Sequence, residues 1–197
     1  MAAPGQLSVA RVAGRRTLLG ITGAPASGKS TVAALVAARH GGVVVPMDGF
    51  HLSDDRLREL GRLDRKGAPD TFDAAGYVDL LRLLRTSEAT VFAPAFDRSR
   101  EQTVPNAIKV APNALVVTEG NYLLLTEPPW SAVRPLLDAC WFVEVTEAAR
   151  VERLIARHVS YGWDPAAARL RATTGSDAAN ARLVAATRDR ADVVVAG

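Results

Sequence analysis

The stretch from Gly23 to Ser30 constrains this chain more than any other, because it reads G-x-x-x-x-G-K-S, the pattern of a phosphate-binding loop. Its glycines let the backbone turn tightly and bring N–H groups close to phosphate oxygens, while the next helix adds positive partial charge at its N-terminus. Apolar residues including Leu18 and Leu19 precede the motif, and a segment of high helix propensity follows it. This context favours a phosphate-binding loop over a surface turn. The predicted phosphate-binding residues are Gly23, Ala24, Pro25, Ala26, Ser27, Gly28, Lys29, Ser30 and Thr31.

Two side chains at the end of the motif predict what the loop holds. Lys29 is expected to reach the β- and γ-phosphates of a bound nucleotide. The Ser30 hydroxyl is expected to hold Mg²⁺. Both predictions follow from the motif, which places these side chains at the start of a helix.

Length and composition are those of one ordinary soluble domain. The 197 residues are 48% hydrophobic and 23% charged, and no apolar run approaches the ~20 residues that cross a bilayer. Residues 1–14 lack the apolar core of a signal peptide, so we expect them to form a flexible N-terminal segment. The single domain is expected to cover residues 15–197. The protein is expected to be cytoplasmic, without a membrane partner. A net charge of +3 without a basic block argues against nucleic acid as a partner. Cys140 lies in an apolar run and is expected to be a buried core thiol.

Two carboxylates follow predicted buried strands. Asp48 comes after residues 43–47 and Glu119 after residues 114–118, and in open α/β sheets ligands bind at the carboxyl ends of strands. Asp48 is the predicted catalytic base, because phosphoryl transfer to an alcohol needs an acceptor for the hydroxyl proton. Glu119 is predicted to hold the hydration shell of Mg²⁺ or to position Asp48. For both residues the alternative is a turn-starting acid. His51 contacts the substrate or caps the next helix, and both interpretations stay open.

The rest of the pattern predicts alternating strands and helices. Pro46 favours an edge strand, because proline cannot donate a ladder hydrogen bond. Asp73 is a predicted N-cap, and Asp164 with Pro165 opens a later helix. The predicted helices cover residues 52–63, 74–85 with the core residues Tyr77, Leu80, Leu81 and Leu84, 130–137, a segment from 146, a segment from 164, and 177–188. The other predicted strands cover residues 90–95, 108–110, 140–145 and 192–195.

Polar residues in two irregular segments are candidate substrate contacts. Arg65 and Lys66 lie in a loop broken by Gly and Pro, and the alternative for them is solvated loop charge. Phe96 and Arg98 lie between the strands at 90–95 and 108–110, which are expected to form a small flap over the acceptor site. The predicted substrate residues are therefore His51, Arg65, Lys66, Phe96, Arg98 and Glu119.

Three arginines share one side of the helix that begins near residue 146. Arg150, Arg153 and Arg157 fall at i, i+3 and i+7, opposite Val151, Leu154, Ile155 and Val159. They form either a solvated basic face or a lid that neutralises charge on a transferred phosphoryl group. Both interpretations stay open from the helix pattern alone.

Six segments in order resemble the phosphoribulokinase/uridine kinase/type I pantothenate kinase family. They are residues 23–30, 45–51, 69–73, 94–97, 118–121 and 191–195. The resemblance implies a P-loop NTPase fold, a three-layer α/β sandwich whose five-stranded parallel sheet has helices on both faces, with a β flap and a helical lid. It also implies ATP-dependent phosphorylation of a small-molecule hydroxyl, with Mg²⁺, Asp48 as base and Arg150 with Arg153 in the lid. A homodimer stays open.

Departures from the uridine kinase pattern bear on the acceptor. Uridine kinases carry an aspartate for the ribose hydroxyls three residues before their P-D-x-F-D run, where this chain has Gly67. Their pyrimidine-contacting aromatics are not reproduced around His51 and Arg98. Residues 65–69 look more like type I pantothenate kinases and the bacterial fructose-transport kinases. A polar or acidic metabolite, sugar or nucleoside is therefore the expected acceptor, with a uridine-type kinase as the first alternative.

Two other classes are compared with this kinase hypothesis. A regulatory GTPase is excluded, because it would need an N-K-x-D motif that the chain lacks. A catalytically silent nucleotide-binding regulator is the alternative of another class. The presence of Lys29, Ser30, Asp48 and Glu119 favours retained chemistry over that alternative.

Overall fold

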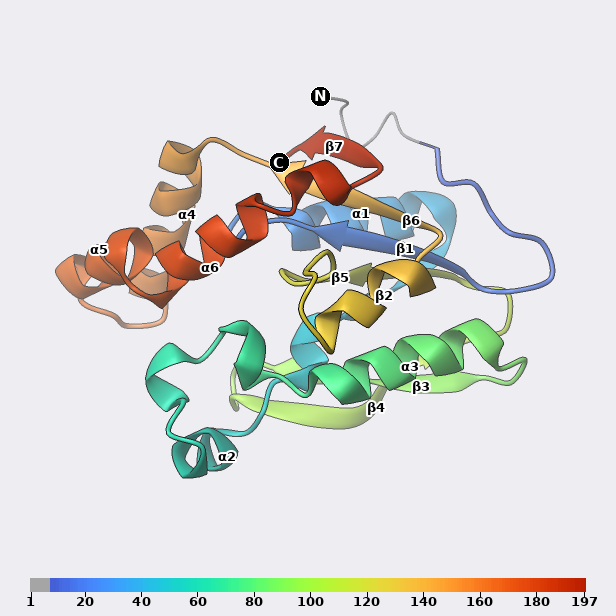
Figure 1. The fold of residues 1–197 in the computed structure, drawn as a ribbon, viewed down its shortest axis with the longest axis horizontal. Helices are drawn as coiled ribbons and strands as arrows, with labels where there is room; N and C mark the ends of the chain where they lie inside the picture. Colours follow the sequence, from blue (N-terminus) through green and yellow to red (C-terminus); the bar gives the residue numbers. More distant parts are fainter. Residues whose placement is uncertain (1–7) are drawn as a thin grey trace.

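A five-stranded parallel sheet forms the centre of the computed structural model, which describes residues 8–197 (Figure 1). Every neighbouring pair of strands is parallel. The edge position predicted from Pro46 is confirmed, because its strand begins the sheet. In spatial order the strands are β2 (Gly42–Pro46), β5 (Leu115–Glu119), β1 (Thr17–Thr22), β6 (Ala139–Glu144) and β7 (Val193–Ala196).

Helices cover both faces of this sheet and make it a three-layer sandwich. On one face α1 (Lys29–His40) packs Val36 and its neighbours against Ile21 and Val117. On the other face Leu18 and Val116 pack in a larger core with residues of α3 (Ala74–Thr86) and α6 (Ser176–Ala185). Because side chains of β1 alternate between the two cores, all six of its residues are buried. The predicted P-loop NTPase fold is confirmed.

The helix α3 begins and packs as its sequence predicts. The Asp73 side chain accepts a hydrogen bond from the Gly76 N–H at 2.9 Å, which caps the first turn. Tyr77, Leu81 and Leu84 are fully buried. The Tyr77 hydroxyl lies 2.6 Å from the Thr118 hydroxyl, so the helix is joined to β5 by a buried hydrogen bond as well as by apolar contact.

The segment 130–137 is not the helix that its sequence predicts. It forms two 3₁₀ turns, η5 (Trp130–Ala132) and η6 (Arg134–Leu136). Pro135 lies within the second turn and has no N–H to donate, which prevents a continuous α-helix there. Cys140 is a buried free thiol as expected, and burial raises its pKa to about 12.

A two-stranded antiparallel hairpin lies beside the sheet, near α3 (Figure 1). Its strands are β3 (Val91–Asp97) and β4 (Gln102–Val110), both longer than predicted. The buried guanidinium of Arg16, 2% exposed, donates to five carbonyls that join the hairpin base to the end of α3. They belong to Leu84, Ser87, Ala89, Val110 and Ala111. The sequence offered no sign of this anchor.

The predicted flexible segment, residues 1–14, is only partly described, since residues 1–7 lie outside the described range. Of the others, Arg11 donates to the Asn113 carbonyl at 3.0 Å, and the Val12 N–H donates to the Thr17 hydroxyl at 2.8 Å. Val9 packs against the core on the α1 side. Residues 9–12 therefore contact the folded domain.

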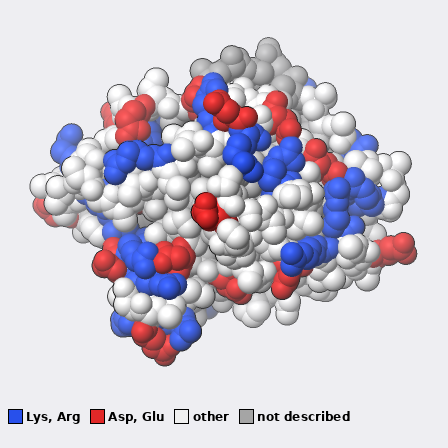
Figure 2. Space-filling view, in the orientation of Figure 1, with Lys and Arg blue, Asp and Glu red and all other residues white. Residues whose placement is uncertain are grey.

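Three helices gather at the carboxyl end of the sheet, coloured orange to red in Figure 1. They are α4 (Glu147–Ser160), α5 (Pro165–Thr174) and α6. The helix α2 (Asp54–Glu59) lies at the lower left of Figure 1 and is shorter than the predicted helix over 52–63. Within residues 8–197 no helix has the length and apolar character needed to traverse a bilayer. Figure 2 shows cationic and anionic side chains intermingled on the viewed face, without a field of one sign.

Candidate active site

The phosphate-binding loop connects β1 to α1 with the geometry that its glycines allow. Gly28 has φ +94°, a left-handed conformation that favours glycine. A β-carbon at Gly23 would lie 2.5 Å from the Ser27 hydroxyl, so only glycine permits this close approach. No side chain caps the N-terminus of α1, and its first turn contains no acidic residue. The free N–H groups and Lys29 therefore form a site suited to phosphate.

Glu119 is brought to this loop by the register of the sheet. It is the last residue of β5 and pairs with Ile21 of β1 and Pro46 of β2. The Ser30 hydroxyl donates to its carboxylate at 3.0 Å. Burial raises the pKa of Glu119 and lowers that of Lys29, while the opposite charges of these two groups partly offset both effects. A hydroxyl and a carboxylate held together in this way suit a hydrated Mg²⁺.

Among the described residues, no protein-only metal cluster accompanies this pair. The described residues contain no group of three or more His, Cys, Asp and Glu side chains that could hold a metal ion. Mg²⁺ usually keeps several waters and binds through one or two protein ligands plus substrate phosphates. Ser30 and Glu119 beside the phosphate loop fit that mode of binding.

Asp48 lies in the 3₁₀ turn that follows β2, and it lines the same cavity as Lys29, Ser30 and Glu119. Arg98 of the hairpin donates to its Oδ2 atom at 2.5 Å, and His51 Nε2 lies 3.9 Å from its Oδ1 atom. The His51 ring stacks on Phe72 at 4.1 Å and contacts Phe96 at 4.8 Å, measured between ring centroids. The structure thus brings Asp48, His51, Phe96 and Arg98 together, as the predicted flap requires.

Burial lowers the pKa of His51 to about 4, against the effect of Asp48 and with added effects of Lys66 and Arg98. In the unfolded chain histidine takes up its proton near pH 6.5, so acidification below that pH favours unfolding until the folded imidazole also titrates. Between pH 7 and pH 5 we expect the unfolding free energy of the wild type to fall by about 2 kcal/mol more than that of His51→Phe, because the variant lacks this imidazole. Urea unfolding at both pH values checks this, and equal losses in the two proteins would refute it.

The three arginines of α4, Arg150, Arg153 and Arg157, do not share one environment. Arg150 is 2% exposed, and two of its nitrogens donate to the Glu147 carboxylate at 2.7 Å each. It lines a separate cavity of about 210 Å³ between α4, α6 and the phosphate loop. The structure therefore places Arg150 in neither a solvated face nor the cavity of Lys29. It is buried with Leu154, one turn further on, whereas the predicted core residue Val159 is 40% exposed.

Arg153 and Arg157 are directed to the phosphate loop instead. Arg153 Nη1 would lie 3.6 Å from a β-carbon at Gly28. Arg157 lines the same cavity as Lys29, and its charge lowers the Lys29 pKa. Within residues 8–197 neither side chain makes a hydrogen bond or ion pair. Two guanidinium groups are therefore available to a ligand beside the loop.

A cavity of about 230 Å³ joins these parts at the carboxyl end of the sheet, and we call it the rim cavity. Its lining includes seven residues predicted to be catalytic, metal-binding or substrate-binding, as well as Pro25 of the phosphate loop and Arg157. Arg65 does not reach it, because its guanidinium pairs with Asp70 at 2.7 Å. Lys66 does reach it, and it also pairs with Asp54 and Glu101 at 2.7 Å each. The predicted residues that line the cavity most directly are Lys29, Ser30, Asp48, His51, Lys66, Arg98 and Glu119.

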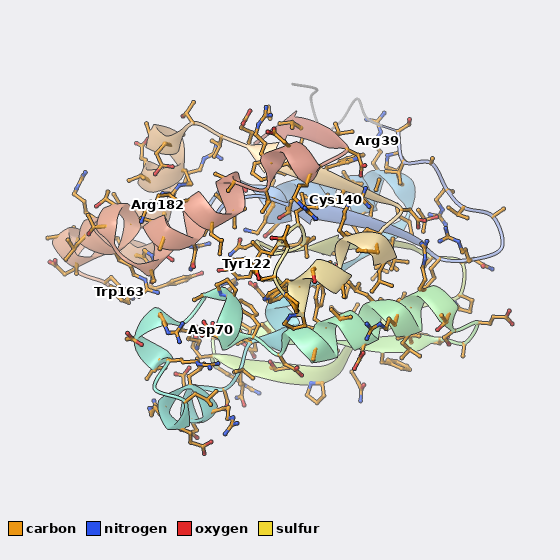
Figure 3. All side chains as sticks on the ribbon, viewed as in Figure 1. Arg39, Asp70, Tyr122, Cys140, Trp163 and Arg182 are labelled. Atoms are coloured by element: carbon orange, nitrogen blue, oxygen red, sulfur yellow. The ribbon has the colours of Figure 1, made fainter. Side chains whose placement is uncertain are left out.

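Several lining residues were not predicted from the sequence. Arg171 Nε and His158 Nε2 lie 3.2 and 2.8 Å from the Asp177 carboxylate. The Asn180 amide donates to the Gly67 carbonyl at 3.2 Å. Tyr122 does not line the cavity, but its hydroxyl donates to the same carbonyl, and in Figure 3 this residue lies near the centre of the molecule. These residues belong to no short motif, since tertiary packing alone brings α4, α5 and α6 over the loop at 65–73.

The comparisons with known proteins agree with this geometry. The model of the Phosphoribulokinase / Uridine kinase family matches residues 18–196. A Schizosaccharomyces pombe protein named "Putative uridine kinase C227.14" is 38% identical, over 75% of this chain and 68% of that protein. An Aspergillus versicolor "ATP-dependent kinase-like protein notR'" is 37% identical, over 60% of this chain and 74% of that protein.

A solved structure from Silicibacter sp. TM1040, described as a "putative fructose transport system kinase", superposes with a TM-score of 0.82 at 39% identity. It covers 91% of this chain and 89% of that one. The match of the family model extends from β1 to β7 and so includes the phosphate loop, the hairpin and the helices α4 to α6. The chain belongs to the phosphoribulokinase/uridine kinase family of P-loop small-molecule kinases.

Proposed function

We propose that this protein transfers the γ-phosphoryl group of ATP to a hydroxyl of an acidic or polyhydroxylated small molecule. The observation that carries the proposal is the rim cavity, where Lys29, Ser30 and Glu119 lie together with Asp48 and the cations Lys66 and Arg98. A nucleotide site and a carboxylate base therefore share one opening with groups that bind oxyanions.

Each of these residues has a distinct role in the proposed reaction. The N–H groups of the phosphate loop and Lys29 bind and orient the phosphates. Ser30 and Glu119 would hold Mg²⁺, which when bound supplies positive charge to the phosphate oxygens. Asp48 accepts the proton of the acceptor hydroxyl as the hydroxyl oxygen bonds to the γ-phosphorus; the bond from the γ-phosphorus to the β,γ-bridging oxygen breaks, and ADP leaves. Arg153 and Arg157 stabilise the negative charge on the transferred group.

The cations of the rim cavity support the choice of acceptor. Lys66 and Arg98 line the rim cavity together with Asp48, and position 67 is a glycine where a ribose-binding carboxylate would be expected. The Gly67 carbonyl already accepts hydrogen bonds from Tyr122 and Asn180. A carboxylate, phosphate or cluster of hydroxyls on the acceptor would pair with the two cations.

The experiment is a competition assay with ATP, Mg²⁺ and equal concentrations of uridine and a panel of hydroxy acids, sugars and sugar phosphates. We expect an acidic or polyhydroxylated compound to be phosphorylated in preference to uridine, and Arg98→Ala to raise the KM for it by about tenfold. Arg100→Ala is the matched control, since Arg100 lies in the same turn but outside the rim cavity.

The name of the S. pombe relative favours uridine as the second candidate. Dominant phosphorylation of uridine, unaffected by Arg98→Ala, would support that candidate and would show that the cations do not select the acceptor. Absence of phosphorylation of any compound, together with normal ATP binding, would favour a catalytically silent regulator.

A further inference from the structure

The contact between Arg98 and Asp48 covers part of the proposed base, which a role of Arg98 in substrate binding alone does not explain. Arg98 belongs to the turn of the flap, and its guanidinium occupies Oδ2 of the residue that must accept a proton. The Arg98 side chain is 54% exposed and that of Asp48 is 26% exposed. Both groups are thus accessible from the rim cavity, and the contact occupies one oxygen of the proposed base.

The backbone that carries Arg98 is fixed against the turn that carries Asp48. The Thr103 hydroxyl donates to the Gly49 carbonyl at 3.1 Å. A β-carbon at Gly49 would lie 2.6 Å from the Pro94 carbonyl oxygen, so the two backbones are in close contact. Glu101, at the end of the turn, pairs with Lys66 at 2.7 Å. Release of Asp48 therefore requires only a rotation of the exposed Arg98 side chain, without movement of the hairpin.

The turn itself is held in shape near Arg98. Asp97 accepts hydrogen bonds from the Ser99 N–H at 2.9 Å and from the Ser99 hydroxyl at 2.6 Å, which lowers the pKa of Asp97. Arg100 lies 3.8 Å from the same carboxylate and is 71% exposed. The two arginines of the turn thus differ, because Arg98 is held by the proposed base and Arg100 only by its own turn.

We propose that Arg98 is a positioning residue that shields Asp48 until an acceptor draws its guanidinium away. An oxyanion or hydroxyl cluster on the acceptor competes with Asp48 for the same donors. Binding of the acceptor then frees the carboxylate at the moment a hydroxyl is available to it. In the absence of an acceptor the shield keeps Asp48 from activating water and so protects ATP from hydrolysis. This inference rests on the proposed function, because it takes Asp48 as the base.

The side reaction that the shield suppresses is the hydrolysis of ATP by water. A water oxygen forms a bond to the γ-phosphorus, and the bond between the γ-phosphorus and the β,γ-bridging oxygen breaks. ADP leaves with that electron pair, and the water proton passes to the Asp48 carboxylate. The products are ADP and inorganic phosphate, and no reactant other than ATP and water is consumed.

The experiment measures phosphate release from ATP and Mg²⁺ with no acceptor present. We expect Arg98→Ala to hydrolyse ATP about tenfold faster than the wild type, because the base is exposed to water. Arg98→Lys should lie between the two, since an ammonium group can still pair with the carboxylate. Arg100→Ala is the matched control and should hydrolyse ATP at the wild-type rate.

The double variant Asp48→Asn/Arg98→Ala distinguishes two causes of faster ATP hydrolysis, namely loss of the shield on Asp48 and a general loosening of the flap. If the shield acts on Asp48, the double variant falls back to the wild-type rate or below it. Hydrolysis by Arg98→Ala no faster than the wild type, or an increase that survives in the double variant, would overturn the shield and leave the proposed kinase activity in place. Calorimetric titration with ATP runs in parallel, and a wild-type protein that does not bind ATP would overturn the proposed function and the shield together.

Discussion

Replacement of Lys29 by alanine is expected to lower the rate of phosphoryl transfer from ATP at least about 100-fold, or ~2.7 kcal/mol of transition-state stabilisation. Lys29 starts α1 at the point where the phosphates would lie, and its charge faces Glu119 and Asp48. The variant leaves these two carboxylates without their cation beside a polyanionic ligand. ATP affinity should fall as well, because Lys29 contacts the phosphates in the ground state and in the transition state.

The measurement combines initial rates of ADP formation with thermal unfolding. The fold should persist, since the core around β1 and α1 consists of apolar residues that the variant retains. Lys109→Ala provides the matched control, because Lys109 is exposed on β4 and far along the hairpin from the turn. Near-normal activity of Lys29→Ala would remove the assignment of the nucleotide site.

Asp48→Asn is expected to reduce kcat by about 10²- to 10⁴-fold, the range over which a positioned general base acts. Asparagine fills the same space and can still accept a hydrogen bond from Arg98, so the flap contact should survive. It cannot take up the hydroxyl proton. Because Asp48 lies outside the phosphate loop, ATP affinity should change little, which separates this variant from Lys29→Ala.

Steady-state kinetics with the acceptor found in the competition assay and calorimetric titration with ATP test this expectation. Asp55→Asn, whose side chain is 92% exposed on α2, is the control for removal of one carboxylate. If Asp48→Asn bound ATP normally and turned over as fast as the wild type, the base would have to be another residue.

The parts of the fold that the sequence predicts well are those set by local chemistry. Asp73 caps α3, Asp164 with Pro165 opens α5, and Pro46 lies in an edge strand, because caps and prolines act on their own backbone. The phosphate loop is equally local. These features depend on neighbours within a few residues, which a single sequence displays directly.

The parts that the sequence could not predict depend on contacts between distant segments. Arg150 and Arg153 are only three residues apart, yet Arg150 is buried and pairs with the exposed Glu147, whereas Arg153 is directed to Gly28. The helix pattern alone places both on one side, and only the packing of α5 against α4 separates them. Arg65 and Lys66 are adjacent, and pairing of Arg65 with Asp70 leaves only Lys66 in the rim cavity.

The register that places Glu119 beside Ile21 and Pro46 has a consequence for which parts of the site can tolerate substitution. The spacing of the phosphate loop, Glu119 and the turn of Asp48 is fixed by ladder hydrogen bonds between main chains, which do not depend on side-chain identity. Under the proposed function, selection of the acceptor would instead depend on side chains of the hairpin, the loop at 65–73 and α4 to α6. Substitutions in these outer segments can change what is phosphorylated while the distances needed for phosphoryl transfer stay constant.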